Sequence, residues 1–488
     1  MSHGAPLLAF ADCGPPIRPP PAGLRRQQFK AGLRSHQGTR AWLRRSPFRG
    51  PCAGRLTTAV HSPDPFLTRW LRRASPAAFA AYCIAAAFGA YFCMYAFRKP
   101  WSAATFEGQQ LLGLGLKEIL VASQLVGYTA SKFIGLRFVS ALDPARRARV
   151  LLALIAAAEL ALLGFALAPV PLAPLFLVLN GLPLGMVFGL VLGFLEGRRM
   201  TEALTAGLCA SFIFAGGAVK SVGRGLIVEH GVGERWMPFA TGALFAPLLL
   251  LCVWMLTRIP PPTEEDERDR HERVPMDAAA RRRVFRTHRV VLLSLCVVYA
   301  LITIVRTIRD DFAVELWAEL GVSDRPSIFA RSELAVMVLV TLLNGAAFLI
   351  RDHGRAFRIA VLTVPAGFAL VIGSVLAQRA GSFGAFPFMV AVGFGMYVPY
   401  VAFHTTVFER FLASVRERGN LSYPLYLADS AGYLAALLLL FGRGGIEPVA
   451  ERARYLPLFT NLCVLTGVAA SLLAIAVLIA RRRATASP

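Results

Sequence analysis

The sequence is poor in charge and almost lacks lysine. Charged residues make up 17% of its 488 positions, hydrophobic residues make up 56%, and the mean hydropathy is +0.56. This balance excludes an ordinary soluble globular domain. Only five of the 52 basic residues are lysines, namely Lys30, Lys99, Lys117, Lys132 and Lys220. Because the chain uses arginine for its ordinary surface charge, a lysine inside an apolar run indicates a specific role.

Cysteine and histidine are too scattered to indicate a metal site. The eight cysteines form no CxxC pair, six of them lie inside apolar runs, and no histidine stands at ligand spacing. The chain also has no recognisable nucleophile–base pair and no glycine loop suited to phosphate. The sequence therefore predicts no disulfide framework, no metal, no cofactor and no enzyme activity.

The formal net charge of +23 is spread unevenly along the chain. Cations concentrate in the short connectors and in the first 73 residues, where only Asp12 and Asp64 oppose them. This distribution argues against a nucleic-acid partner. The composition of residues 1–73 predicts disorder, and the segment is either an organellar targeting sequence or the product of a start assigned too early.

Long apolar runs, each near the length of about 20 residues that crosses a bilayer, dominate the rest of the chain. We expect twelve spans: Pro76–Arg98, Glu118–Ala141, Val150–Ala168, Leu172–Leu195, Thr201–Ile227, Trp236–Leu256, Val290–Asp310, Phe329–Ile350, Ile359–Ala377, Phe383–Phe408, Ser422–Phe441 and Leu456–Ala480. An even number places both termini on one side, and the distribution of Lys and Arg among the loops favours the cytoplasm. The sequence predicts an all-α, multi-pass membrane protein, in a bacterial inner membrane with both termini cytoplasmic.

A short repeat divides the spans into two sets of six. The loop motif D-x-x-R-x-x-R occurs after the second span and again after the eighth, and we expect it to have a conformational role. It consists of Asp143, Arg146, Arg149, Asp352, Arg355 and Arg358. We expect a tail over 1–73, a six-helix half over 74–257, a solvated linker over 258–289, a second half over 290–480 and a tail over 481–488. Two related halves of six spans are typical of major-facilitator transporters, in which the halves rock about a site near the membrane midplane. The third helix of each triplet should then face lipid.

Charged and polar side chains recur at helical spacing inside several spans. Tyr95 and Arg98 lie in the first span, Lys132 in the second and Lys220 in the fifth, while the seventh carries Tyr299 and Arg306. A central Arg or Lys costs about 2.5–3.5 kcal/mol on insertion, so water, acids or an anionic ligand must offset it. Asp310, one turn after Arg306, is the obvious acidic partner, but acids are too few to balance the rest. The excess of positive charge indicates a site for carboxylate or phosphate.

The first two spans resemble one transporter family closely. "FGAYFCMYAFRKPW" followed by "GYTASKFIGLRF" is similar to the first two helices of the organophosphate:phosphate antiporters of the major facilitator superfamily, which include glycerol-3-phosphate and hexose-phosphate transporters. The likeness is specific over about 60 residues. "YALITIVRTIRDDF", "GFGMYVP" and "GYL" resemble parts of its seventh, tenth and eleventh helices. The resemblance implies that Arg98 and Arg306 grip phosphate as a pseudo-symmetric pair, assisted by Lys132.

The sequence departs from that family at several places. The fifth span has no histidine where the glycerol-phosphate branch has one, Arg137 is an additional cation, and "DDFAVE" replaces a family motif in the seventh helix. These differences concern the substrate more than the fold. We therefore expect a divergent branch.

Other interpretations of single residues stay open. Arg98 could be a cation at the membrane rim, and we expect Lys99 to be one. Glu159, on a helix that should face lipid, is expected to pack or to reach the interface. Asp429 and His404 are candidates for proton coupling.

The function that the residues favour is a secondary transporter of a small organic anion. We expect Arg98, Lys132, Arg306, Tyr95, Tyr299 and Lys220 to bind the substrate, in a monomer embedded in the bilayer. The alternatives are a proton-coupled symporter of another solute and a transporter-like sensor that binds without flux.

Overall fold

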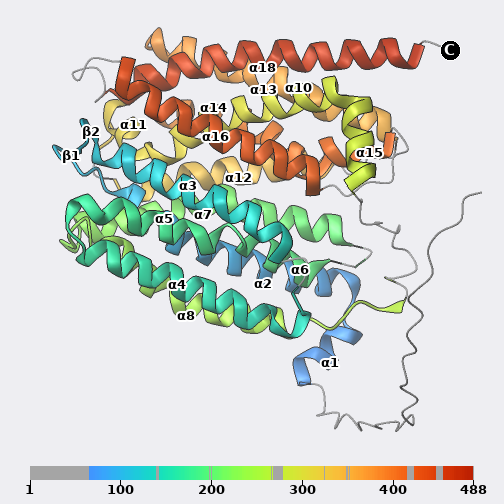
Figure 1. Cartoon of the computed structure of the whole chain (residues 1–488), viewed down its shortest axis with the longest axis horizontal. Coiled ribbons are helices and arrows are strands. Elements are labelled where there is room, and N and C mark those ends of the chain that lie inside the picture. Colours follow the sequence, from blue (N-terminus) through green and yellow to red (C-terminus); the bar gives the residue numbers. More distant parts are fainter. Residues whose placement is uncertain are drawn as a thin grey trace, which may run out of the picture. The chain divides into compact units, whose positions relative to one another are not determined.

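The structure, a computed structural model, describes residues 65–138, 142–196, 198, 200–264, 266, 278–323, 325–347, 350, 352–414, 422–446 and 454–486. All of these belong to one compact unit, Ser62–Pro488 (Figure 1). The prediction of disorder over residues 1–64 lies outside the described residues.

Helices occupy each of the first six predicted spans. They are α2 (Pro76–Arg98), α3 (Leu116–Phe138), α4 (Arg147–Leu167), α5 (Ala173–Leu184) with α6 (Val187–Leu195), α7 (Thr201–Val228) and α8 (Met237–Thr257). The fourth span is broken between α5, which ends at Leu184, and α6, which begins at Val187.

The second set of spans is helical as well. It comprises α10 (Ala278–Asp311), α12 (Ser327–Ala347), α13 (His353–Arg379), α14 (Ala385–Ala402) with the π-helical turn η4 (Phe403–Val407) and α15 (Phe408–Ser414), α16 (Ser422–Ile446) and α18 (Tyr455–Ala486). Shorter elements are α1 (Phe66–Arg73), α11 (Ala313–Glu319), η1 (Pro100–Ala103), η2 (Pro144–Arg146), η3 (Val170–Leu172) and the antiparallel pair β1 (Gln110–Leu111) and β2 (Leu114–Gly115).

Ten helices in the described part of the chain are long and apolar enough to cross a membrane. The other two predicted spans form α3 and α16, of 23 and 25 residues, which carry more polar side chains. The four helices expected to face lipid, α4, α8, α13 and α18, expose large apolar side chains such as Leu160, Leu248, Leu362 and Leu472. The all-α membrane architecture is confirmed.

The helices pack as two related sets. In the first, α2 contacts α7 and α8, and α3 contacts α5; in the second, α10 contacts α16 and α18, and α14 contacts α12 and α13. The two sets meet mainly where α7 packs on α12 and α3 packs on α16. We call the end of the bundle that carries β1, β2 and α11 the hairpin end, and the opposite end, with α1 and the start of α10, the linker end (Figure 1).

Glycine allows one of the closest helix contacts. A Cβ on Gly127 of α3 would lie 2.1 Å from the carbonyl oxygen of Val178 on α5, and one on Gly181 would lie 2.5 Å from that of Gln124. No larger residue fits either position without separating the helices. These two glycines therefore serve close helix packing.

Two boundaries differ from the prediction. Residues 66–73, assigned to a disordered tail, form α1, because Thr68 and Leu71 are buried on one side of it. Residues 278–289, assigned to a solvated linker, belong to α10, which departs from helical geometry at His288. Composition alone suggested solvated chain in both places, whereas the first segment forms a separate helix before α2 and the second extends the seventh span.

Candidate functional site

Arg98 lies inside the protein. Only 4% of the Arg98 surface is exposed, and residues 99–104, which follow it, are buried too. The end of α2 is held by side chains: Trp101 Nε1 donates to the Arg98 carbonyl at 2.9 Å, and Gln124 Nε2 donates to the same oxygen. Interpreting Arg98 as a membrane-rim cation is therefore wrong.

The guanidinium groups of Arg98 and Arg306 lie against tyrosine rings. Arg98 Cζ is 3.8 Å from the ring centre of Tyr128, and Arg306 Cζ is 4.8 Å from that of Tyr400. Cations are attracted to aromatic faces at these distances, more strongly where water is excluded. Tyr95 and Tyr433 each interact electrostatically with both guanidinium groups, so the two arginines, one from each half, share one tyrosine-lined region.

Neither arginine forms an ion pair with a carboxylate of the described residues. The Nε atoms of Arg98 and Arg306 are buried and have no hydrogen-bond partner there. Arg309, three residues after Arg306, differs sharply, because its Nη1 contacts Glu333 Oε1 at 2.5 Å and its Nη2 donates to the Met389 carbonyl at 3.0 Å. A buried charge is costly unless it is paired, so Arg98 and Arg306 differ from Arg309 in having no ion-paired carboxylate among the described residues.

Asp310 forms no ion pair with Arg306, the partner expected from one-turn spacing, although the Arg306 charge still acts on its carboxylate. Its Oδ1 bonds Lys220 Nζ, and its Oδ2 lies 3.6 Å from Lys99 Nζ. Gly216 on α7 permits this approach, because a Cβ there would lie 2.9 Å from Asp310 Oδ1. Spacing along α10 suggested the one-turn partner, whereas the carboxylate is directed at the other half of the protein.

Lys99 is not an exposed rim residue. It is 4% exposed, and its Nζ bonds Asp311, whose side chain is fully buried. Lys117, at the start of α3, pairs with Glu315 Oε1 of α11 at 2.6 Å. These contacts connect the first half to the second at the hairpin end.

Lys132 and Asp429, predicted for different roles, form one ion pair of 2.9 Å between α3 and α16. Tyr299 donates to Asp429 Oδ1 at 2.9 Å, and His404 Nε2 lies 3.5 Å from the Tyr299 hydroxyl. His404 Nδ1 is 3.0 Å from the Tyr400 carbonyl. The structure thus joins the second-span lysine to both proton-coupling candidates.

All four lysines of the described residues therefore pair with a carboxylate of the second half. Their order along the helices is informative. On α10 and α11, Tyr299, which contacts Asp429, comes first, then Arg306, then Asp310 and Asp311, and last Glu315. The two unpaired arginines lie between an ion pair on the linker side and several on the hairpin side.

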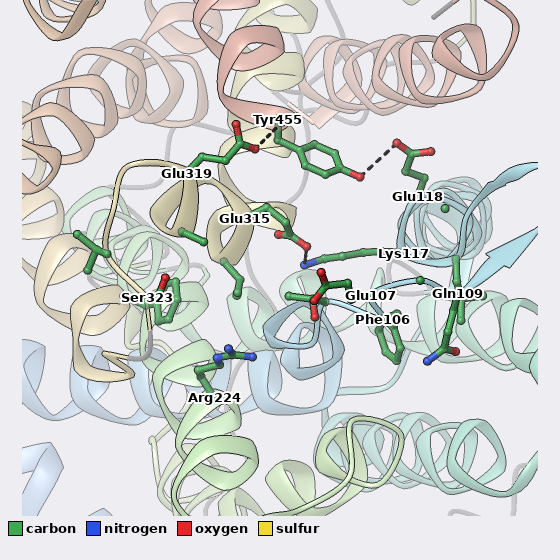
Figure 2. Close-up of a pocket in the computed structure, with 18 of the residues that line it drawn as sticks. Phe106, Glu107, Gln109, Lys117, Glu118, Arg224, Glu315, Glu319, Ser323 and Tyr455 are labelled. Atoms are coloured by element: carbon green, nitrogen blue, oxygen red, sulfur yellow. Dashed lines mark hydrogen bonds and ion pairs between the residues drawn. The ribbon is translucent and has the colours of Figure 1, made fainter. Parts of the chain in front are cut away.

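A cavity of about 520 Å³ opens between the halves at the hairpin end. Figure 2 shows Lys117 reaching Glu315 in this cavity, Glu319 beside Tyr455, and Arg224 on the opposite wall. None of the side chains predicted to bind substrate lines it. The cavity is therefore separate from the arginine pair, and the paired residues Asp310 and Asp311 come between them along α10.

The repeated loop motif has a local role in both copies. Asp143 accepts a hydrogen bond from the Ala145 amide at 3.0 Å at the start of η2, and Asp352 accepts one from the Arg355 amide at 2.5 Å at the start of α13. Both aspartates thus satisfy backbone donors at a helix start, as N-cap residues do. The proposed conformational role of the motif stays a prediction.

Glu159 lies where α4 packs on α8. Its two carboxyl oxygens are buried and have no hydrogen-bond partner among the described residues. A Cβ on Gly242 would lie 2.1 Å from Glu159 Oε2, so the carboxyl fills the space above that glycine. The packing interpretation of Glu159 is supported by this contact.

Sequence reasoning missed Asp311 and Glu315 as partners of lysine. The signal was present in "DDFAVE", which places three acids at the end of the seventh span, the end at which Lys99, Lys117 and Lys220 of the first half also lie. Among the described residues, no group of His, Cys, Asp or Glu side chains is placed to hold a metal ion.

A family model described as a family of unknown function, DUF5690, matches residues 100–483. The chain belongs to this family. No curated protein matches it.

Solved structures with the same fold are major-facilitator transporters. A D-xylose-proton symporter is 15% identical, with a TM-score of 0.51 over 80% of this chain and 97% of that one. The partially occluded, inward-open xylose transporter XylE from E. coli is 12% identical, with a TM-score of 0.51 over 80% and 97%. A peptide transporter in complex with alafosfalin is 12% identical, with a TM-score of 0.51 over 82% and 94%. The major-facilitator fold is therefore confirmed, whereas the organophosphate antiporter likeness and the site residues stay predictions.

Proposed function

We propose that this DUF5690 member is a secondary transporter that moves a small organic anion by alternating access. The observation that carries the proposal is the pair Arg98 and Arg306, two buried guanidinium groups from opposite halves without a carboxylate partner among the described residues. Phosphate esters are the first substrate class to test, since a planar guanidinium binds phosphate through two parallel hydrogen bonds.

The anion would bind between the arginines and draw the halves together. Arg98 and Arg306 repel each other when the site is empty, and a bound dianion removes that repulsion. Tyr95 and Tyr433, which interact with both cations, would donate hydroxyl hydrogen bonds to the remaining oxygens. Because the empty carrier keeps two like charges facing each other, it should change state slowly, and this favours exchange of one anion for another.

The lysine pairs supply the contacts that must break and re-form. Lys99, Lys117 and Lys220 bond the second half at the hairpin end, whereas Lys132 does so towards the linker end. Opening the hairpin end would break the first group, and opening the linker end would break the last. We further propose that the linker end is cytoplasmic, in a bacterial inner membrane.

Proton-coupled symport is the second candidate, because Asp429 contacts Lys132 and Tyr299 next to His404. Protonation of Asp429 would release Lys132 into the site. Uptake that collapses with the proton gradient and fails in Asp429→Asn supports symport. Uptake that needs internal anion and ignores the gradient supports exchange.

Binding is tested by thermal-shift screening of the purified protein against phosphate esters, inorganic phosphate and carboxylates. Arg98→Ala and Arg306→Ala should each abolish the shift produced by the best anion. Arg331→Gln is the matched control, because Arg331 is an exposed arginine of α12. Stabilisation that survives both alanine substitutions contradicts the site.

Flux is measured next in proteoliposomes with and without the same anion inside. Exchange predicts rapid uptake only into loaded vesicles. Rapid uptake into empty vesicles excludes strict antiport. Binding without flux under every condition excludes transport and leaves a transporter-like sensor.

A further inference from the structure

The amphipathic helix α1 lies directly before the first span at the linker end (Figure 1). It ends at Arg73, and α2 begins at Pro76, where the Ser75 hydroxyl accepts a hydrogen bond from the Ala78 amide at 3.3 Å. So short a connection keeps α1 at the surface of the membrane that α2 enters. Any side chain that α1 exposes is therefore exposed at the lipid–water boundary.

One side of α1 is fastened to the protein. Leu71 is 2% exposed and Thr68 is 7% exposed. The Thr68 hydroxyl donates to the Arg258 carbonyl at 3.0 Å, which ties α1 to the end of α8. The helix therefore has a fixed orientation and presents a defined outer face.

That outer face combines aromatic and cationic side chains. Phe66 is 77% exposed and Trp70 is 46% exposed, with the exposed arginines Arg69 and Arg73 beside them on the helix. Aromatic rings and arginines together are typical of helices that lie in the headgroup region. The sequence has no acidic residue between Asp64 and Glu107, so nothing on α1 or α2 offsets this charge.

The neighbouring end of α8 continues the same chemistry. Trp254 is 46% exposed, and Arg258 Cζ lies 5.1 Å from its ring centre. The outer face of α1 is suited to a negatively charged group with an apolar body on the membrane side.

We propose that the outer face of α1, formed by Phe66, Arg69, Trp70 and Arg73, is a binding surface for anionic phospholipid headgroups. The arginines bind the phosphate and the negative headgroup, while the aromatic rings lie among the upper acyl chains. The surface does not depend on the transport site, because α1 contributes no residue to the arginine pair. A neutral phospholipid offers the same apolar contacts with no net charge.

The test uses the full chain in nanodiscs of phosphatidylcholine containing an equal fraction of brominated phosphatidylglycerol or brominated phosphatidylcholine. Bromine quenches tryptophan at short range, and the contribution of Trp70 is the difference between the wild type and Trp70→Phe. We expect brominated phosphatidylglycerol to quench Trp70 at least twofold more than brominated phosphatidylcholine. That preference should vanish in Arg69→Gln/Arg73→Gln.

The matched control is Arg286→Gln/Arg289→Gln, which removes two exposed arginines at the linker end of α10 without touching α1. It should keep the preference for the anionic lipid. Equal quenching by the two lipids in the wild type overturns the proposal, as does equal loss of the preference in both double variants. Absence of quenching by either lipid also overturns it, because α1 would then lie away from the membrane.

Discussion

Lysine and arginine are used differently inside this bundle. Lys99, Lys117, Lys132 and Lys220 all pair with carboxylates across the two halves, whereas Arg98 and Arg306 face tyrosine rings and have no such partner among the described residues. An ammonium is a compact charge that needs no particular orientation, while a guanidinium is a planar fork that matches phosphate. The contrast suggests that lysine serves contacts that are exchanged, and arginine serves a ligand that must be oriented.

The largest effect is expected from removing Asp310, the acid that lies near both Lys99 and Lys220. Asp310→Asn removes the acid that bonds Lys220 and lies near Lys99, and we expect a loss of about 3 kcal/mol in the free energy of unfolding, because unpaired buried charge is unfavourable. The melting temperature in detergent measures it. Asp352→Asn is the control, since asparagine caps a helix as well as aspartate does.

The double variant Asp310→Asn/Lys220→Gln completes that experiment. It removes one cation together with the acid and should recover part of the lost stability. If the double variant is no more stable than Asp310→Asn, the ion pair is not the cause of the loss.

The second prediction exchanges the two cations. Arg98→Lys keeps the charge but loses the fork, so the affinity for the best anion should fall by about 30-fold, equivalent to about 2 kcal/mol. Lys220→Arg should leave that affinity within about threefold, because the cation at this position is already paired with Asp310. Isothermal titration calorimetry of both variants measures the affinity for the anion. An equal loss of affinity in both variants contradicts the different roles proposed for arginine and lysine.

The third prediction concerns a carboxyl that lacks any counter-charge. Glu159→Met should raise the free energy of unfolding by about 1 kcal/mol, because it replaces a buried carboxyl that has no hydrogen-bond partner among the described residues with an apolar side chain of similar length. Gly242→Ala should lower it, since its Cβ would lie 2.1 Å from Glu159 Oε2. A decrease on Glu159→Met would show that the carboxyl has a partner in the membrane.

The smallest expected effect is a pH dependence at the edge of the cavity. Burial raises the pKa of Glu315 in α11, despite the opposing charge of Lys117. A raised pKa means that the folded state holds the proton more tightly than the unfolded state, so this contribution to stability is complete below about pH 4.5 and is lost as the pH rises through the folded pKa. The melting temperature of the wild type relative to Glu315→Gln should therefore fall over that range. A flat difference contradicts the shift.

Much of the fold was predictable, because apolar length is a local property. The first span was predicted as Pro76–Arg98, and α2 has these bounds. The predictions that were wrong concern contacts between different helices. Asp310 was assigned to Arg306 from one-turn spacing, but its partner is Lys220 on α7, and no spacing within one helix contains that information. The helix α1 was not predicted, because the arginine-rich composition of its segment suggested disorder and the amphipathic pattern covers only eight residues.

The scarcity of exposed amines has a practical consequence. Every lysine in the described part of the chain is almost fully buried in an ion pair, with Lys30 alone lying outside that part. Reagents that acylate primary amines at neutral pH should therefore modify these four positions only when a pair is broken. Acylation at Lys117, followed by peptide mapping, would report opening of the hairpin end without any engineered label, and acylation at Lys132 would report opening of the linker end.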